Sequence, residues 1–293
     1  MRIHKYQNIF QHLLYSKLFR LPEWIFQKAK YANHDFSKNV LINMRLGHKL
    51  ELAATQPYLK RVVINRSYND EGVFFLKQYL KPGAVIIDIG ANIGLLTCAY
   101  AKRYQDLKPE IYAIEAVEDN YKLLNKNIEI NGFKNVKTFR LALGKNKGEI
   151  TFKLPFKGFT GNAVGNNILN NEDIESVSKT HFYEEVVPLN TLDAWAQENH
   201  IEKCDFIKID VEGAEIAVFE GGIEFIKKTR PVIQSEFNRY YVESQGMSVN
   251  DYVNFFESLN YECYVEDHKY FSRLDPQNFP HHLVDLLFVP KKS

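Results

Sequence analysis

Cysteine is scarce in this chain of 293 residues. Its three cysteines, Cys98, Cys204 and Cys263, are widely spaced and form no C-x-x-C pair. An odd number with this spacing excludes a complete disulfide framework and a common arrangement of zinc ligands. A reducing compartment is therefore expected, and we predict a cytoplasmic protein.

Long hydrophobic runs are also missing. No stretch approaches the ~20 consecutive apolar residues that a membrane-spanning helix needs. Hydrophobic residues make up 45% of the chain and charged residues 25%. These are ordinary values for a globular protein, and they exclude a disordered, collagen-like or coiled-coil chain. The length suits one large α/β domain, alone or with an appendage.

Charge is distributed unevenly along the chain, although the net charge is only +1. Residues 1–61 carry 11 Lys or Arg against 3 Asp or Glu, whereas the remainder carries 26 against 33. A basic arm therefore precedes an acidic body. The body lacks the positive field with which proteins neutralise phosphates, so we expect no nucleic acid among its partners.

Apolar residues near the N-terminus recur at steps of three and four: Ile9, Phe10, Leu13, Leu14, Leu18 and Leu21. This spacing predicts an amphipathic helix, and we interpret residues 1–60 as a basic, largely helical extension. Two roles stay open for it. The extension packs on the main body or on the second subunit of a homodimer, or it rests on an anionic membrane as a peripheral contact at the inner face.

Short apolar runs alternate with segments of helical period from residue 81 onward, which predicts an α/β domain with a parallel sheet over residues 61–293. The last run has no helix after it, so we expect it to be a final antiparallel strand. The seven predicted strands are Ala84–Asp88, Ile111–Glu115, Val136–Leu141, Asp205–Asp210, Pro231–Glu236, Glu262–Val265 and Leu283–Val289.

A long polar stretch rich in Gly and Asn interrupts this rhythm at about residues 155–188. Structureless segments of such length inside a compact domain usually carry function. We interpret this one as a lid-like insertion that covers the substrate, with a tolerated surface excursion as the alternative.

The most informative segment, residues 85–97, is an apolar run followed by a bend of small residues and the start of a helix. Gly90 and Gly94 lack a Cβ, so the backbone there can approach a ligand closely. The amides of the helix start would point at the polar part of that ligand. The bend resembles a nucleotide-binding loop but is not the complete G-x-G-x-x-G of dinucleotide folds.

Two acidic residues mark the ends of consecutive predicted strands. Glu115 follows Gly94 by 21 residues, where an acidic side chain reaches the ribose hydroxyls of a bound adenosine. Asp88 would repel a pyrophosphate but could hold the ammonium of an amino acid, directly or through water. The chain has no phosphate-binding Gly-Lys-Ser/Thr loop. The combination favours S-adenosylmethionine over NAD or a nucleoside triphosphate.

Several segments together form a recognisable pattern: residues 88–94, Glu115, Asn127–Asn131, Ala142–Gly144 and above all Ile207–Glu215, followed by Pro231 and Glu236. The chain from about Glu71 onward resembles the FkbM family of S-adenosylmethionine-dependent methyltransferases. The resemblance implies a three-layer, Rossmann-like class I methyltransferase sheet of about seven strands with the last antiparallel. It also implies O-methylation of a hydroxyl on a sugar, a glycan or glycolipid, or a polyketide-like small molecule.

The same resemblance assigns the cofactor contacts. The residues placed under the methionine end are Gly90, Ala91, Asn92 and Gly94. Glu115 would hold the ribose, Ala142 would lie near the adenine edge, and Asp210 would face the sulfonium from the tip of the fourth strand.

Asp210 and Glu236 end consecutive strands and are the predicted catalytic residues. One carboxylate would accept the proton of the acceptor hydroxyl while their mutual repulsion raises its basicity. Alternatively Asp210, Glu236 and Asn238 would bind Mg²⁺, which would lower the pKa of the hydroxyl. Glu212 and Glu215 are interpreted mainly as acids that stabilise a helix start.

Two other functions stay open at this point. One is methylation of a nitrogen in a protein or nucleic acid, although the sequence lacks an Asn-Pro-Pro-Tyr motif. The other is a non-catalytic cofactor-binding module. For the preferred small-molecule or glycan acceptor we predict an aromatic binding surface made of Phe156, Phe159, Phe182, Tyr240 and Tyr241.

Overall fold

The computed structural model of the chain describes residues 2–4, 25–32, 35, 38–53, 57–154, 183–267 and 270–291. The predicted N-terminal amphipathic helix, with its apolar residues from Ile9 to Leu21, lies outside these residues, and a short helix follows at residues 25–30. Most of the predicted lid, together with Phe156, Phe159 and Phe182, also lies outside them. Among the described residues, no helix is both long enough and apolar enough to cross a membrane.

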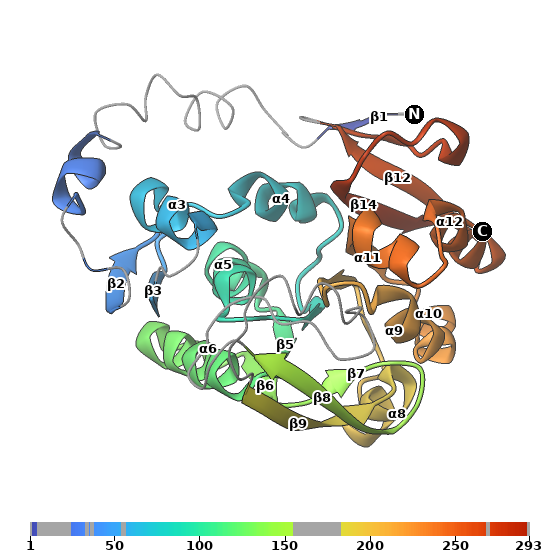
Figure 1. Cartoon of the computed structure of the whole chain (residues 1–293), viewed down its shortest axis with the longest axis horizontal. Coiled ribbons are helices and arrows are strands. Elements are labelled where there is room, and N and C mark those ends of the chain that lie inside the picture. Colours follow the sequence, from blue (N-terminus) through green and yellow to red (C-terminus); the bar gives the residue numbers. More distant parts are fainter. Residues whose placement is uncertain are drawn as a thin grey trace.

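A nine-stranded sheet in the order β1-β13-β12-β14-β11-β10-β4-β5-β6 forms the centre of the molecule (Figure 1). Five of its strands are mutually parallel: β4 (Val85–Ile89), β5 (Glu110–Ile114), β6 (Val136–Phe139), β10 (Phe206–Ile209) and β11 (Val232–Asn238). Every residue of β4 and β10 is buried, as expected for strands covered on both faces. All five parallel strands were predicted.

The strand β14 (Leu283–Pro290) lies between β11 and β12 (Tyr261–Asp267) and runs antiparallel to both. This confirms the predicted final antiparallel strand. Two strands that the sequence pattern did not predict, β13 (Tyr270–Arg273) and β1 (Arg2–His4), extend the sheet beyond β12 and raise the number of strands from seven to nine.

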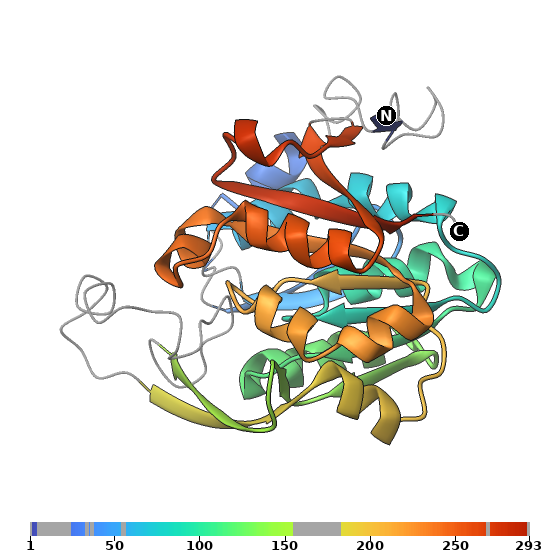
Figure 2. The ribbon, with the colours of Figure 1, turned by 90° about the vertical axis from the view of Figure 1, so that its right-hand side faces the viewer.

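Helices cover both faces of the sheet, so the predicted three layers are present (Figures 1 and 2). Val85, Ile87 and Ile89 pack among the helices of one face, which are α8 (Leu192–Glu198), α9 (Glu215–Glu220), α10 (Ile223–Thr229), α11 (Arg239–Ser244) and α12 (Val249–Ser258). Ile86 points to the opposite face. The helices there are α3 (Pro57–Asn65), α4 (Asp70–Phe75), α5 (Leu95–Arg103) and α6 (Glu118–Asn131).

Part of the N-terminal extension is a β-hairpin and not a helix. Its strands β2 (Asn39–Asn43) and β3 (Lys49–Ala53) pair antiparallel, and Leu50 and Leu52 are fully buried. Two asparagines of α6 bind the free edge of β3 as a neighbouring strand would. Asn127 bonds the main-chain N and O of Glu51 (2.6 and 3.0 Å), and Asn131 bonds those of Lys49 (both 2.7 Å).

A separate three-stranded sheet consists of β7 (Ala142–Leu143), β8 (Gly148–Leu154) and β9 (Tyr183–Asn190). Leu154 pairs with Tyr183, so the predicted insertion leaves and re-enters the fold at adjacent positions. Residues 183–188, which were predicted to end the insertion, belong to β9 instead.

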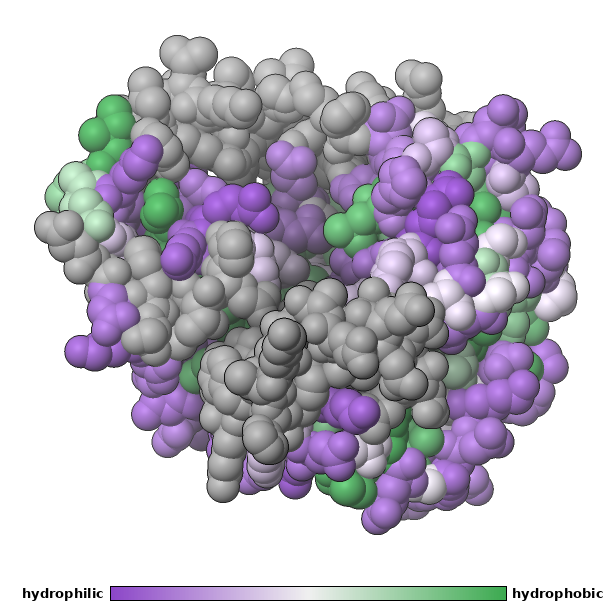
Figure 3. All heavy atoms as spheres, in the orientation of Figure 1, coloured by the Kyte–Doolittle hydropathy of each residue, from purple (hydrophilic) through white to green (hydrophobic). Residues whose placement is uncertain are grey.

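Hydrophobic side chains are exposed near the N-terminal segment. Ile25, Phe26 and Leu41 are 54%, 64% and 54% exposed, and the space-filling view shows hydrophobic residues at this edge of the molecule (Figure 3). A membrane or subunit contact of the extension stays a prediction, and these side chains are where it can be tested.

Candidate active site

A cavity of about 240 Å³ opens at the carboxyl ends of the central parallel strands. It lies where the strand order reverses between β10 and β4, the position at which open α/β sheets bind their ligands. Eight predicted site residues line it together: Asp88, Gly90, Ala91, Asn92, Glu115, Ala142, Asp210 and Glu236. The spatial grouping expected from the sequence is therefore present.

The bend after β4 depends on residues in the left-handed region, since Gly90 has a φ of 79° and Asn92 a φ of 52°. A Cβ on Gly90 would lie 1.9 Å from the main-chain oxygen of Asp210. The close approach of the bend to the end of β10 therefore requires glycine. The amides of Gly90 and Ala91 both donate to the main-chain oxygen of Ile114 at 2.9 Å, which fixes the bend to β5.

Gly94 lies just before α5. Among the described residues, it is not one of those that line the cavity, although Asn92 and Leu95 are, and its predicted cofactor contact stays a prediction. A Cβ at Gly94 would lie 2.8 Å from Cδ1 of Leu124 on α6. The glycine therefore allows α5 and α6 to pack closely.

Glu115 joins the bend to the start of α6. One carboxylate oxygen accepts the amide of Asn92 at 2.8 Å. The other accepts the amide of Val117 at 2.9 Å and the side-chain amide of Asn120 at 3.4 Å. Burial raises the pKa of Glu115 to about 7, although these donors oppose the rise. The predicted ribose contact stays a prediction.

Asp88 is buried at the inner end of the cavity, where its carboxylate accepts the hydroxyl proton of Thr97 on α5. Burial raises the pKa of Asp88 to about 6, and the hydrogen bond from Thr97 and the charge of Lys208 oppose that rise. The predicted contact with an ammonium group is not tested by this arrangement.

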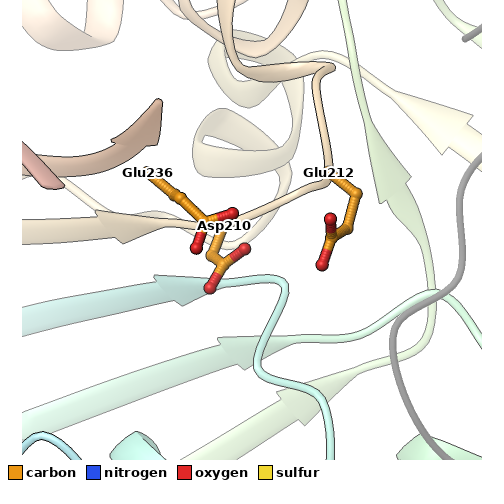
Figure 4. A group of neighbouring side chains, drawn as sticks. All are labelled: Asp210, Glu212 and Glu236. Carbon is orange, nitrogen blue, oxygen red and sulfur yellow. The ribbon is translucent and has the colours of Figure 1, made fainter. Parts of the chain in front are cut away.

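Three carboxylates converge at the end of the cavity formed by β10 and β11. Each of Asp210, Glu212 and Glu236 has an oxygen within 4.8 Å of the other two. In Figure 4 the carboxylates of Asp210 and Glu236 lie next to each other, and Glu212 faces the same space from the loop after β10. Glu212 adopts a left-handed φ of 54° there.

Burial shifts the protonation of this group. It raises the pKa of Glu236 to about 9, and the neighbouring charge of Asp210 adds to the rise. Burial also raises the pKa of Asp210, which Lys208 opposes. Two neighbouring carboxylates whose charges interact titrate as a pair.

Lys208 lies beneath this pair and is 3% exposed. Its ammonium is 3.2 Å from a carboxylate oxygen of Asp285 on β14 and 4.0 Å from one of Asp210. Asp285 also accepts the side-chain amide of Gln234 at 2.6 Å. The buried cation is therefore held mainly by Asp285 and lies near Asp210.

Asn238 is one of the three predicted Mg²⁺ ligands, but its side chain caps a helix. Its side-chain oxygen accepts the amide of Tyr240 at 3.2 Å and caps α11, because a short polar side chain readily bonds the backbone next to it. Glu212 forms an all-oxygen group with Asp210 and Glu236, the donor type that Mg²⁺ prefers.

Glu215 behaves as predicted and stabilises the start of α9. It is 1% exposed, and its carboxylate accepts the amides of Val211 and Gly213 at 3.1 and 3.2 Å. The interpretation of Glu212 as a similar helix acid is wrong, because its carboxylate lines the cavity.

The aromatic residues of the cavity were missed. Tyr58 and Tyr68 line it, although nothing in their local sequence links them to the bend after β4. Within the described residues, the predicted Tyr240 and Tyr241 are not part of the lining, and Tyr240 is 51% exposed. Apolar residues complete the lining of the cavity and include Leu141, Leu143, Ile150 and Phe152.

The order β6-β5-β4-β10-β11 with β14 inserted antiparallel, and the cavity at its switch point, together define a class I methyltransferase fold. The chain belongs to the family described as the methyltransferase FkbM domain, which matches residues 88–263, more than half of its length. The resemblance found in the sequence is thereby confirmed.

Known proteins similar to the chain include 2-O-methyltransferase NoeI of Sinorhizobium fredii, which is 29% identical over 51% of this chain and 62% of its own length. Ribosomal protein L11 methyltransferase of Caldanaerobacter subterraneus subsp. tengcongensis is 33% identical over 25% of this chain and 22% of its own length. The chain thus spans between 22% and 62% of the curated relatives it matches.

Among solved structures, methyltransferase FkbM from Methylobacillus flagellatus KT aligns over 92% of this chain and 59% of its own, with a TM-score of 0.44 and 14% identity.

Proposed function

We propose that this protein is an S-adenosylmethionine-dependent O-methyltransferase. Its acceptor would be a hydroxyl of a sugar, a glycan or glycolipid, or a polyketide-like small molecule. The main support for the proposal is that three features line the same cavity: the glycine bend after β4, Glu115, and the pair Asp210 and Glu236. Membership of the FkbM family supports the methyl transfer, and the carboxylate pair supports an acceptor that must lose a proton.

The charge of the cavity fits a cationic donor. Its described lining contains one cationic residue, Lys208, against five acids: Asp88, Glu115, Asp210, Glu212 and Glu236. Such a site favours a positively charged ligand and disfavours the phosphates of a dinucleotide. S-adenosylmethionine carries a sulfonium, which makes its methyl group electrophilic. A neutral thioether product would lose part of the attraction, which favours its release.

The residues of the cavity divide between the two ends of such a donor. The bend at residues 90–92 would hold the methionine end and Glu115 the ribose. The apolar part of the lining, with Ala142 and Leu143, would take the adenine, since flat aromatic ligands bind against apolar side chains. This leaves the acid pair next to the reacting methyl group.

Asp210 and Glu236 would accept the proton of the acceptor hydroxyl. In-line transfer needs the hydroxyl oxygen within roughly 3–3.5 Å of the methyl carbon. A carboxylate at this position can both orient the hydroxyl through a hydrogen bond and take its proton. Burial raises the pKa of both acids, which makes the ionised form of either one a stronger base.

Two of the similar proteins provide evidence on the type of acceptor. NoeI is by name a 2-O-methyltransferase and matches about half of this chain, which supports an oxygen acceptor. The ribosomal protein L11 methyltransferase matches a quarter of the chain and supports the alternative of a protein acceptor more weakly.

Product mass spectrometry tests the proposed function. The full-length protein is incubated with methyl-labelled S-adenosylmethionine and a panel of nucleotide sugars, oligosaccharides, glycolipids and polyketide alcohols, with ribosomal protein and RNA as separate arms. We expect the label on a hydroxyl oxygen in the first group. Label that appears only on a nitrogen of protein or RNA would contradict the proposal.

Metal removal separates the two ways of activating the hydroxyl. We expect methyl transfer to survive exhaustive dialysis against EDTA, because the carboxylate pair itself accepts the proton. Activity that disappears with EDTA and returns with Mg²⁺ would show instead that Asp210, Glu212 and Glu236 act as metal ligands. The same assay on Glu212→Gln provides the matched control, because this change removes a ligand but leaves the pair intact.

A further inference from the structure

Two tyrosines from outside the family match contribute to the cavity. Tyr58 lies on α3 and Tyr68 in the loop after it, whereas the match begins at residue 88. Both side chains line the cavity, with ring centroids 6.3 Å apart and ring planes inclined by 48°. They form a continuous aromatic surface that we call the tyrosine wall.

The tyrosine wall lines the same cavity as Asp210 and Glu236. After burial, the charge of Asp210 is the largest cause that raises the pKa of both phenols, and Glu236 also raises that of Tyr68. A neutral phenol carries an O–H donor, and both tyrosines share the lining of the cavity with the carboxylate pair. The acceptor hydroxyl has to arrive at this pair.

Packing beneath α3 holds the wall in place. Leu59, Val62 and Val63 are almost completely buried and share a hydrophobic cluster with Ala91 and Ile93 of the bend. The wall is therefore fixed to the same loop that would bind the donor.

The β-hairpin formed by β2 and β3 is hydrogen-bonded to the C-terminal end of α3. The guanidinium of Arg45 donates to the main-chain oxygen of Asn65 at 2.7 Å, and the Arg45 amide donates to that of Arg66 at 2.8 Å. A surface preformed in this way binds without the cost of ordering it.

We propose that the tyrosine wall binds the acceptor and selects a pyranose ring. The proposal rests on the function proposed above. The face of an aromatic ring carries negative charge density and attracts the C–H groups of a sugar, while the phenol O–H groups can donate to its hydroxyl oxygens. Tyr58 and Tyr68 would thus determine specificity while Asp210 and Glu236 receive the proton.

Saturation-transfer NMR on the complex with S-adenosylhomocysteine tests the proposal. The probes are methyl α-D-glucopyranoside, methyl α-D-mannopyranoside and methyl β-D-galactopyranoside, with the open-chain polyol sorbitol as a control ligand. The variants are the doubles Tyr58→Leu/Tyr68→Leu and Tyr58→Phe/Tyr68→Phe. Tyr79→Leu is the matched control, because Tyr79 is also partly buried but lies outside the described lining.

We expect the wild type and Tyr79→Leu to bind at least one glycoside, and sorbitol to give no signal. The Leu double variant should weaken glycoside binding about tenfold, and the Phe double variant, which keeps the rings, should weaken it less. Affinity for S-adenosylmethionine, measured by calorimetry, should stay nearly unchanged in all variants.

Three results would overturn the proposal: a wild-type complex that binds none of the glycosides, a Leu double variant that binds them as the wild type does, or a Leu double variant that loses affinity for S-adenosylmethionine. The last result would place the tyrosines over the donor. If the wild type itself fails to bind S-adenosylmethionine, the function proposed above is wrong.

Discussion

Glu236→Gln is expected to lose methyl transfer by about 10²–10⁴-fold, the usual contribution of a positioned proton acceptor, and to keep its affinity for S-adenosylmethionine at pH 7, below the pKa of about 9 of Glu236. The substitution preserves the shape of the side chain but removes its ability to take a proton. Asp210→Asn should have a similar effect on turnover. Single-turnover rates, with calorimetry for cofactor binding, separate the chemical step from binding.

Glu243→Gln is the control for this experiment. Glu243 lies on α11 shortly after Glu236, is exposed, and pairs with Arg239 at 3.2 Å, so its loss should leave the rate unchanged. A Glu236→Gln enzyme that turns over as fast as the control would rule out the proposed proton acceptor.

The same pair predicts the pH dependence of the rate. A proton acceptor works only when it is ionised, and burial together with Asp210 raises the pKa of Glu236 to about 9. The rate of the wild type should therefore rise with pH from about pH 6 towards that value. The rise should disappear in Glu236→Gln.

Glu115→Ala is expected to weaken S-adenosylmethionine binding by about 2–3 kcal/mol, which is roughly 30- to 150-fold. Two losses contribute: the predicted ribose contact, and the acceptors that hold the amides of Asn92 and Val117 in place. Calorimetric titration of the variant measures the change.

Glu110→Ala is the matched control, since Glu110 begins the strand that leads to Glu115 but is exposed and pairs with Lys137 on the sheet edge at 2.6 Å. Equal affinities of the two variants would show that Glu115 does not face the cofactor.

The grouping of the bend, Glu115, Asp210 and Glu236 in one cavity could be predicted because parallel strands place their carboxyl ends on one edge of the sheet. Once the strands were identified, residues far apart in the sequence had to meet there. Gly94 shows the limit of this argument: its left-handed φ fits the predicted bend, yet a side chain there would collide with Leu124 on α6. The close packing of α5 against α6 also requires glycine at this position, and the spacing of residues in the sequence does not reveal that contact.

The remaining errors concern side chains that could bond either to neighbours in the sequence or to residues far along the chain. Asn238 bonds the nearby amide of Tyr240 and leaves the metal-like cluster, whereas Glu212 is turned into the cavity by a left-handed backbone. The hairpin within the extension was missed because Asn127 and Asn131, far along the chain, supply the hydrogen bonds at its edge. Because the tyrosine wall depends on that hairpin, it was missed as well.

Comparative titration of S-adenosylmethionine and S-adenosylhomocysteine tests the central claim most directly. If the cavity is the cofactor site, each ligand should bind at one site per chain. From about pH 6 to 8.5 the affinity for S-adenosylmethionine should rise relative to that for S-adenosylhomocysteine. Glu115 and Glu236, with pKa values of about 7 and 9, ionise over that range and make the cavity more negative. Because the sulfonium lowers the pKa of the amino group in S-adenosylmethionine but not in S-adenosylhomocysteine, the titration is repeated on Glu236→Gln, in which the relative rise should be smaller. The absence of S-adenosylmethionine binding at millimolar concentration would contradict the account.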